Sequence, residues 1–247
     1  MQTFYYTDPG KVRSHNEDSV TIINNENKEY LLAVADGMGG HKAGEIASSI
    51  AINHLTESFY KMASLKDKDS AIEWMRTVVQ EINNKIFEYT DANPDSKGMG
   101  TTLVMAIKTD DYILFGNIGD SSGFVIKNST LHKVTKDHTL VNLLVSTGEL
   151  TEEEAKYHPR KNVLMRALGA NNPIEVDIFD VDTSVKGIFL CSDGLTNMLT
   201  AEQIEKALND EDQSIEDTVL KLIKKSNSRG GTDNISIAYL KKESGDL

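Results

Sequence analysis

Hydrophobic and polar residues follow two different patterns along this chain, one typical of strands and one typical of helices. Short runs rich in β-branched and aromatic residues end in turn residues, which predicts strands at 30–35, 101–108, 112–118, 123–126, 187–191 and 235–240. Between residues 101 and 134 the connections are too short for the roughly dozen residues that a parallel crossover needs. We therefore expect a mostly antiparallel sheet.

Helical spacing of apolar residues is clear in three segments, at 46–62, 72–86 and 215–223. Each segment has one apolar stripe that must be buried. Long helices separated from a block of antiparallel strands predict an α+β fold, in which layered sheets are covered by helices. A doubly wound parallel sheet is not expected.

The chain has 247 residues and 39% hydrophobic residues, enough to bury a full core, and no internal boundary is marked. We expect one domain of catalytic size, residues 1–247. The polar segment 137–169 interrupts the strand pattern, so we expect a surface excursion there.

Charge and composition exclude several functions. A formal net charge of -12 opposes binding to nucleic acid, which rewards clustered Lys and Arg. The first residues lack the pattern of a secretory signal, and no stretch approaches the roughly 18 apolar residues of a membrane helix. The single cysteine, Cys191, lies in an apolar run and is expected to be a buried small hydrophobe. These features predict a cytoplasmic protein that does not bind membranes.

Acidic residues fall where predicted strands meet loops. Asp and Gly are common turn residues, so each position alone could be a simple turn. Several buried carboxylates at strand ends would be costly without cations, which makes metal ions the natural partners of the group. The positions are Glu17 and Asp18 before SVTII, Asp36 before Gly37, Asp120 after ILFGNIG, Asp193 before Gly194, and Asp233 before ISIAYL.

Carboxylate and backbone carbonyl oxygens are hard ligands suited to Mg²⁺ or Mn²⁺. The chemistry of cysteine-based phosphatases is excluded, because Asn197 stands where their loop needs Arg after Cys191. The run GMGGHK fits neither a dinucleotide fingerprint nor a P-loop, and no His or Cys pairs support zinc. A divalent ion bound by carboxylates remains.

Six motifs occur in the order typical of one family: TDPGKVRSHNED (7–18), DGMGGH (36–41), GMGTT (98–102), GDS (119–121), SDGL (192–195) and GTDN (231–234). The sequence resembles the bacterial type 2C metal-dependent Ser/Thr protein phosphatases over nearly its whole length. The resemblance implies a sandwich of two mostly antiparallel sheets flanked by helices. It also implies that 137–169 is a flap beside the active site.

The resemblance also assigns roles by position. Asp36 would bridge two ions, with Asp193 and Asp233 completing one site and the carbonyl of Gly37 contributing to the other. Asp18, supported by Glu17, would act mainly through metal-bound water. Asp120, together with Asp193, would hold the third ion of many bacterial members, and Arg13 would clamp the substrate phosphate.

Two positions depart from the family pattern. Ser122 stands where members usually carry Arg, which changes packing or ion pairing near Asp120. Met38 stands where some relatives have His, so His41 is the nearest candidate general acid, although a His beside a Gly turn can equally be a loop hydrogen-bonder.

The implied reaction is hydrolysis of phosphoserine and phosphothreonine on proteins by water activated between two Mn²⁺ or Mg²⁺ ions, without a phosphoenzyme. Two alternatives stay open: hydrolysis of small phosphate esters, and non-catalytic binding of phosphoproteins. The expected partners are phosphorylated proteins and, from the family alone, a cognate Ser/Thr protein kinase. We expect a monomer.

Overall fold

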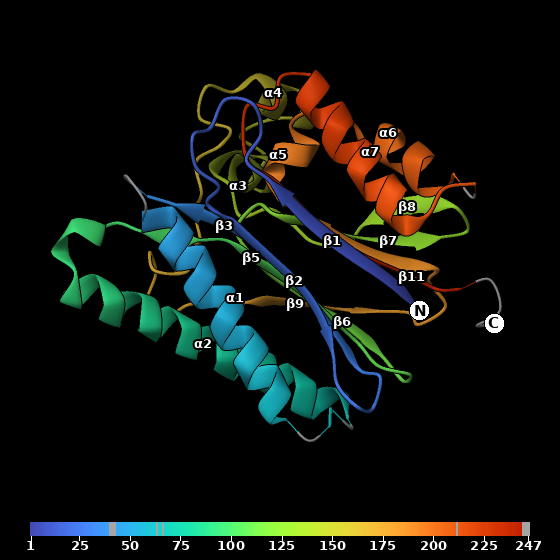
Figure 1. Ribbon diagram of the computed structural model, residues 1–247. Helices are drawn as coiled ribbons and strands as arrows, with labels where there is room; N and C mark the ends of the chain where they lie inside the picture. The colour runs from blue at the N-terminus through green and yellow to red at the C-terminus, as the bar shows by residue number, and fades with distance from the viewer. Residues whose placement is uncertain (40–42, 63, 66, 211, 244–247) are drawn as a thin grey trace.

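The computed structural model describes residues 1–39, 43–62, 64–65, 67–210 and 212–243. Two β-sheets lie face to face, and helices cover the outer face of each (Figure 1). All of the strand pairs are antiparallel. The α+β sandwich expected from the sequence is confirmed.

The five-stranded sheet has the order β1-β11-β10-β7-β8, and the six-stranded sheet has the order β2-β3-β5-β6-β9, with β4 paired to β3. The first sheet consists of β1 (Gln2–Asp8), β7 (Ser122–Lys127), β8 (Thr130–Lys133), β10 (Gly187–Cys191) and β11 (Ile235–Lys241). The second consists of β2 (Asp18–Asn24), β3 (Tyr30–Met38), β4 (Gly100–Thr101), β5 (Leu103–Lys108), β6 (Ile113–Ile118) and β9 (Asp177–Val181).

Two long helices cover the six-stranded sheet, and the C-terminal helices cover the other sheet (Figure 1). The first pair is α1 (Ala43–Lys61) and α2 (Lys68–Ala92), followed by the short 3-10 helix η1 (Pro94–Ser96). Over the five-stranded sheet lie α5 (Asp193–Thr196), α6 (Ala201–Leu208) and α7 (Ile215–Ser228). Asp67 caps α2 by accepting from Ser70 N at 2.8 Å, which fixes where that helix begins.

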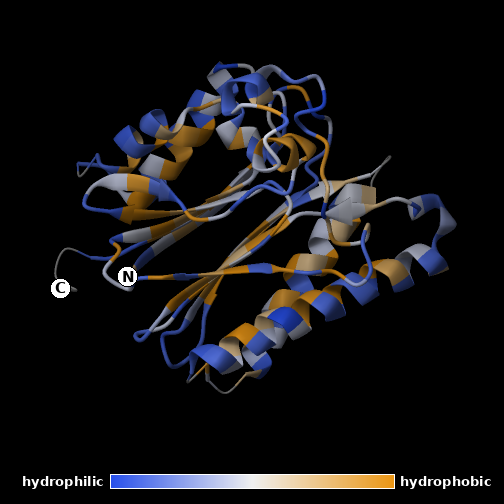
Figure 2. Cartoon of the chain, turned by 180° about the vertical axis from the view of Figure 1, so that it is seen from behind, coloured by the Kyte–Doolittle hydropathy of each residue, from blue (hydrophilic) through white to orange (hydrophobic). Residues whose placement is uncertain are grey.

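Strand β3 shows how the chain builds two cores at once. Because side chains alternate across a strand, Leu31, Ala33 and Ala35 pack against α1 and α2, whereas Leu32 and Val34 face the other sheet. All five residues are fully buried. Hydrophobic residues accordingly line the strands and the inner sides of the helices (Figure 2). A strand buried on both faces reads as a continuous apolar run, as LLAVA does.

Two details of the strand ends correct the sequence interpretation. Asp36 does not end its strand, because β3 continues to Met38 and pairs Gly37 with Thr101 of β4. Asp193 does not end β10 but is the first residue of α5. At Asp36-Gly37 the local turn signal is overridden by the pairing of Gly37 with Thr101.

The segment 137–169 contains two short helices, α3 (Leu140–Ser146) and α4 (Glu152–Tyr157). Thr151 and Glu154 form a capping box at the start of α4, with Thr151 N donating to Glu154 Oε2 at 2.8 Å. Figure 1 places α3 and α4 beside α5, at the end of the sandwich where Asp193 lies. None of the helices built from described residues is both long and apolar enough to cross a membrane.

Candidate active site

A pocket of about 610 Å³ lies at this end of the sandwich, and segments far apart in the sequence line it. Six of the residues predicted from the sequence are in its wall: Arg13, Asp36, Gly37, Asp120, Asp193 and Asp233. Glu17 lines it as well, while Asp18 is buried next to it. Residues of the segment 137–169, such as Asn162 and Arg166, also line it.

Asp18 and Asp36 are paired residues of β2 and β3. Side chains directly opposite across antiparallel strands lie about 4.5 to 5.5 Å apart at Cβ, and like charges there are destabilising. The pairing is enforced by register, because the apolar residues of both strands face the cores and a slip by one residue would reverse them. The fold therefore forces two carboxylates together.

Burial has the largest effect on the acids of the pocket. It raises the pKa of Asp18 to about 7, with Asp193 and Asp233 adding to the rise. Burial, followed by the charges of Asp18 and Asp193, raises the pKa of Asp36 well above its ordinary value. The pKa of Asp193 is raised by burial and by Asp233. In the absence of a cation these carboxylates hold protons more tightly than free aspartate does.

The chemistry of these side chains suits a hard divalent ion. The buried Oδ1 of Asp18 has no hydrogen-bond partner, although Asp18 Oδ2 accepts from Ser192 Oγ at 2.7 Å. An unpartnered carboxylate oxygen at a buried position is costly unless a cation or water meets it. Within the described parts of the chain, no three His, Cys, Asp or Glu side chains are already grouped around one ion position. By chemistry, the donor set fits Mg²⁺ or Mn²⁺.

The backbone at Asp36 is held in place by β4 and its neighbours. Thr102 N donates to Asp36 O at 2.9 Å, and Asp36 N donates to Thr102 Oγ1 at 3.0 Å. The next residue, Gly37, is packed so closely that a Cβ there would lie 2.1 Å from Gly44 O and 2.5 Å from Glu17 O. Glycine is required by this approach of α1 to β3, which places the Gly37 backbone in the pocket wall.

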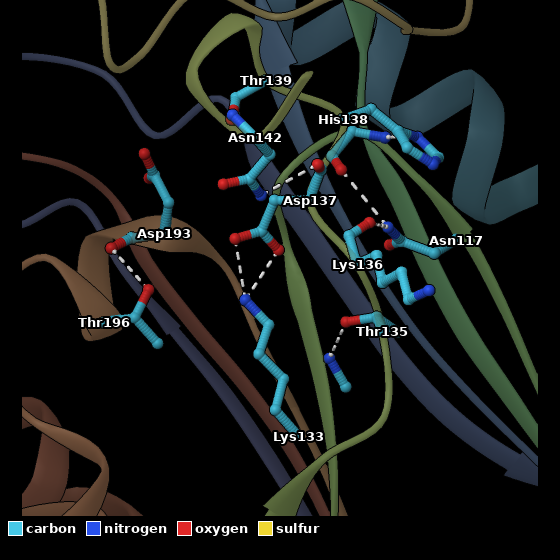
Figure 3. Close-up of polar contacts among 12 residues, drawn as sticks. Asn117, Lys133, Thr135, Lys136, Asp137, His138, Thr139, Asn142, Asp193 and Thr196 are labelled. Atoms are coloured by element: carbon cyan, nitrogen blue, oxygen red, sulfur yellow. Dashed lines mark hydrogen bonds and ion pairs between the residues drawn. The ribbon is translucent and has the colours of Figure 1, made fainter. Parts of the chain in front are cut away.

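Asp120 forms a second acidic position with Asp193. Burial, then Asp193, then Asp137 raise the pKa of Asp120 to about 7. Lys133 Nζ donates to both carboxylate oxygens of Asp137 at 2.7 Å, so this nearby acid already has a cation partner. Figure 3 shows the Lys133–Asp137 pair and Asp193 on facing segments. Of these acids, Asp120 and Asp193 are the ones left to take an added ion.

His138 fixes the turn that carries Asp120. Its backbone N donates to Gly119 O at 2.9 Å, and its Nδ1 accepts from Gly119 N at 3.1 Å. The proton is therefore on Nε2, which donates to Asp177 Oδ2 at 3.1 Å. Burial lowers the pKa of His138, which favours this neutral form.

Arg13 reaches over the pocket from the loop between β1 and β2. Its Nη2 donates to Asp233 Oδ2 at 2.8 Å, and its side chain is half-exposed. The hydrogen bond to Asp233 raises the pKa of Arg13, so the guanidinium is always charged. A planar cation at the mouth of an acidic pocket is suited to bidentate contact with a phosphate.

Two further sequence expectations have different outcomes. His41, the candidate general acid, lies outside the described residues, and its role stays a prediction. Ser122 is buried at the start of β7, while Ser121 Oγ lies 2.8 Å from Thr102 Oγ1. The turn after Asp120 is thus joined by hydroxyl groups to the segment that holds Asp36.

The model of the family described as Protein phosphatase 2C matches residues 11–227. The chain belongs to this family. The match includes the residues that line the pocket, from Arg13 to Asp193, and ends shortly before Asp233.

Similar sequences and structures agree with membership of the protein phosphatase 2C family. The chain is 40% identical over 243 residues to "Serine/threonine phosphatase stp" of Listeria welshimeri, covering 98% of this chain and 96% of that protein. It is 34% identical over 241 residues to "Protein phosphatase PhpP" of Streptococcus pneumoniae, covering 97% of each.

Among solved structures, the S. agalactiae serine/threonine phosphatase superposes with a TM-score of 0.92 at 36% identity, covering 98% of this chain and 99% of that one. Serine/threonine phosphatase Stp1 from Staphylococcus aureus superposes with a TM-score of 0.91 at 34% identity, covering 98% and 95%. The protein phosphatase 2C fold thus extends over nearly the whole chain.

Three motif residues of this protein phosphatase 2C chain, to which the sequence alone assigns no role, support the site. Thr102 holds the backbone of Asp36, Ser192 donates to Asp18, and Asn234 bonds the loop of Arg13. Their partners lie 66 to 225 positions away in the sequence, so no local signal identifies these contacts.

Proposed function

We propose that this protein hydrolyses phosphoserine and phosphothreonine on other proteins, and that it requires Mn²⁺ or Mg²⁺. The observation that carries the proposal is a pocket in which a half-exposed guanidinium faces buried carboxylates with raised pKa values. The names of the relatives support the same substrate class.

Bound divalent ions would supply Lewis acidity and lower the pKa of water in the pocket towards neutrality. Asp36, Asp193 and Asp233 are the proposed ligands of two ions, together with the carbonyl of Gly37. Asp18 and Glu17 orient water beside them, and Asp120 with Asp193 is the proposed place of a third ion.

Arg13 is the proposed phosphate-binding residue. A phosphoryl group in the pocket can meet the guanidinium and the acids together, because half-exposed Arg13 and partly exposed Asp36 line the same wall. Charge-assisted hydrogen bonds from Arg13 would orient the phosphoryl group for in-line attack and neutralise charge on its oxygens.

The remaining proposals concern the cellular setting. A free, buried Cys191 and a net charge of -12 fit a reducing, cytoplasmic environment and oppose binding to nucleic acid. A cognate Ser/Thr protein kinase would supply the phosphorylated substrates, and the enzyme is proposed to act as a monomer.

The substrate class is tested by comparing kcat/KM for a panel of phosphoserine and phosphothreonine peptides with that for small phosphate esters. Peptides should be hydrolysed more efficiently, because the pocket lies open beside a flap whose residues can contact a polypeptide. Higher kcat/KM on small esters would point to a metabolite phosphatase. Tight phosphopeptide binding without turnover would point to a non-catalytic binding protein.

A further inference from the structure

The loop between β1 and β2, residues 9–17, carries Arg13 at its middle. Its backbone is attached to the turn before β11, where Lys11 N and Val12 N donate to Gly231 O at 2.8 and 3.2 Å. Arg13 itself is half-exposed and makes one ion pair, to Asp233. The position of the guanidinium therefore depends on how well the loop beneath it is held.

Asn234 joins the two stems of this loop with one side chain. Its Nδ2 donates to Pro9 O and to His15 O, each at 2.9 Å. Its Oδ1 accepts from Glu17 N at 2.8 Å. A side-chain amide has two N–H donors, and both are used on the loop.

The surroundings of Asn234 leave it little freedom to move. The residue is 4% exposed, and its backbone touches α5, since a Cβ on Gly194 would lie 1.9 Å from Asn234 O. A Cβ on Gly10 would lie 2.3 Å from Asp233 O, so the loop is stacked directly on the turn. Because the amide of Asn234 is buried and fixed, its hydrogen bonds hold the loop in place.

We propose that Asn234 is a positioning residue that holds the Arg13 guanidinium at the mouth of the pocket, and that it thereby sets the affinity for the phosphoryl group. The inference rests on the proposed function, in which Arg13 binds phosphate. Asn234 borders the pocket, but its side-chain amide is used on Pro9, His15 and Glu17, so it acts through the loop. Its loss should weaken phosphate binding to the extent that Arg13 contributes to it.

A double-mutant cycle tests this directly, with inorganic phosphate as the probe and Mn²⁺-saturated protein in a calorimeter. Asn234→Ser should raise the Kd for phosphate by about tenfold, the size of one charge-assisted hydrogen bond. In an Arg13→Ala background the same substitution should cause no further loss. Equal losses in both backgrounds would overturn the proposal, as would unchanged affinity in the single variant.

Glu29→Ala is the matched control for a purely structural effect. Glu29 is a similarly buried polar residue that directly precedes β3, at the end of that strand away from Asp36, and its carboxylate accepts from Asn25 Nδ2, Ser64 Oγ and Leu65 N. This variant should lose stability but keep its Kd for phosphate. If Glu29→Ala weakens phosphate binding as much as Asn234→Ser does, the effect is one of stability and the proposal fails.

Hydrogen exchange gives a second readout that needs neither turnover nor phosphate. In Asn234→Ser, a peptide covering residues 9–16 should take up deuterium faster, while β10 and β11 keep their protection. If wild-type protein binds no phosphate, the proposed function fails, and exchange still decides whether Asn234 anchors the loop. Unchanged exchange would contradict the anchoring.

A milder variant guards against a protein that does not fold. Asn234→Thr keeps one oxygen near Glu17 N and cannot bridge both carbonyl groups. It should give the same non-additive loss of phosphate affinity with Arg13→Ala. If Asn234→Thr unfolds while Glu29→Ala stays folded, Asn234 serves folding rather than positioning, and the proposal is overturned.

Discussion

In the pocket, burial disfavours the charged form of the acidic residues. Asp36 and Asp18 face one another across β2 and β3, and burial raises the pKa of both. Arg13 offsets part of this negative charge, through its hydrogen bond to Asp233 and through its positive charge near Glu17 and Asp193. Placing acids together in this way costs stability in the metal-free state, and the proposed divalent ions would offset that cost.

Arg13→Ala should lower kcat/KM for a phosphopeptide by at least about tenfold, since charge-assisted hydrogen bonds contribute about 1.5 to 3 kcal/mol and about 1.4 kcal/mol is one decade. Steady-state kinetics measure the change. Lys11→Ala, which removes an exposed cation two residues away on the same loop, should have little effect. Equal losses in both variants would indicate general electrostatics in place of a specific contact.

Asp120→Asn should remove one bound ion and slow phosphopeptide hydrolysis while the ions at Asp36 remain. The reason is that, among charged neighbours, Asp193 acts most strongly on Asp120, whereas Asp18 acts most strongly on Asp36. Calorimetric titration with Mn²⁺ counts the ions in wild type and variant. The same stoichiometry in both proteins would remove Asp120 from the set of ligands.

At the scale of elements, the site depends on the contact between β3 and α1. Gly37→Ala would place a methyl group 2.1 Å from Gly44 O, so the helix must move or the strand must bend. We expect a loss of more than about 2 kcal/mol in the free energy of unfolding, measured with urea. A loss of Mn²⁺ affinity should accompany it, because Asp36 and Glu17 flank the contact.

Gly148→Ala is the control for that substitution. Gly148 has φ +79 and no atom within 4 Å of an added Cβ. Alanine there should lower the free energy of unfolding only through backbone strain, by about 1 kcal/mol. If Gly37→Ala costs no more than Gly148→Ala, the close contact seen at Gly37 is unimportant for stability.

The sequence predicted long elements with strong periodicity, and these are confirmed. The segments 72–86 and 215–223 lie within α2 and α7, and 187–191 coincides with β10. Strand β1 escaped prediction because its residues are mostly exposed or half-buried and show no simple alternation. Helices α5 and α6 escaped because four and eight residues are too few to establish a helical period.

The sequence predicted the acidic residues of the candidate site, but not the hydrogen bonds that hold these residues in place. Asp36, Asp120, Asp193 and Asp233 stand in motifs that the sequence displays, and the structure gathers them around one pocket. The hydrogen bonds of Thr102, Ser192 and Asn234 depend on tertiary contacts between distant segments. Such contacts follow from the packed fold and leave no spacing pattern along the chain.

At the scale of the whole molecule, the buried acids make the stability of the metal-free protein depend on pH. Asp18 and Asp120 have pKa values of about 7, above the ordinary 3.8, so the folded state holds their protons more tightly than the unfolded state does. The stability from this source is complete at low pH and is lost as the pH rises through about 7. The lowered pKa of His138 has the opposite effect on the pH dependence of stability. It is one group, whereas several acids have raised pKa values.

In chelator, the protein should therefore melt at a higher temperature at pH 6 than at pH 8. Saturating Mn²⁺ should raise the melting temperature most at pH 8, because ligands must be deprotonated to bind an ion. Differential scanning fluorimetry at both pH values measures the effect. A metal-free protein that is more stable at pH 8 would show that the pocket acids are not protonated in the folded state.

If this pocket hydrolyses protein phosphoesters with divalent ions held by its carboxylates, turnover must depend both on the ions and on Asp36. The most direct measurement is release of phosphate from a phosphothreonine peptide by purified protein in excess chelator, and then after addition of Mn²⁺ or Mg²⁺. We predict no turnover in chelator, recovery with either ion, and no recovery in a folded Asp36→Asn variant. Full turnover in chelator, or normal turnover by Asp36→Asn, would show that the enzyme does not use divalent ions held by these carboxylates.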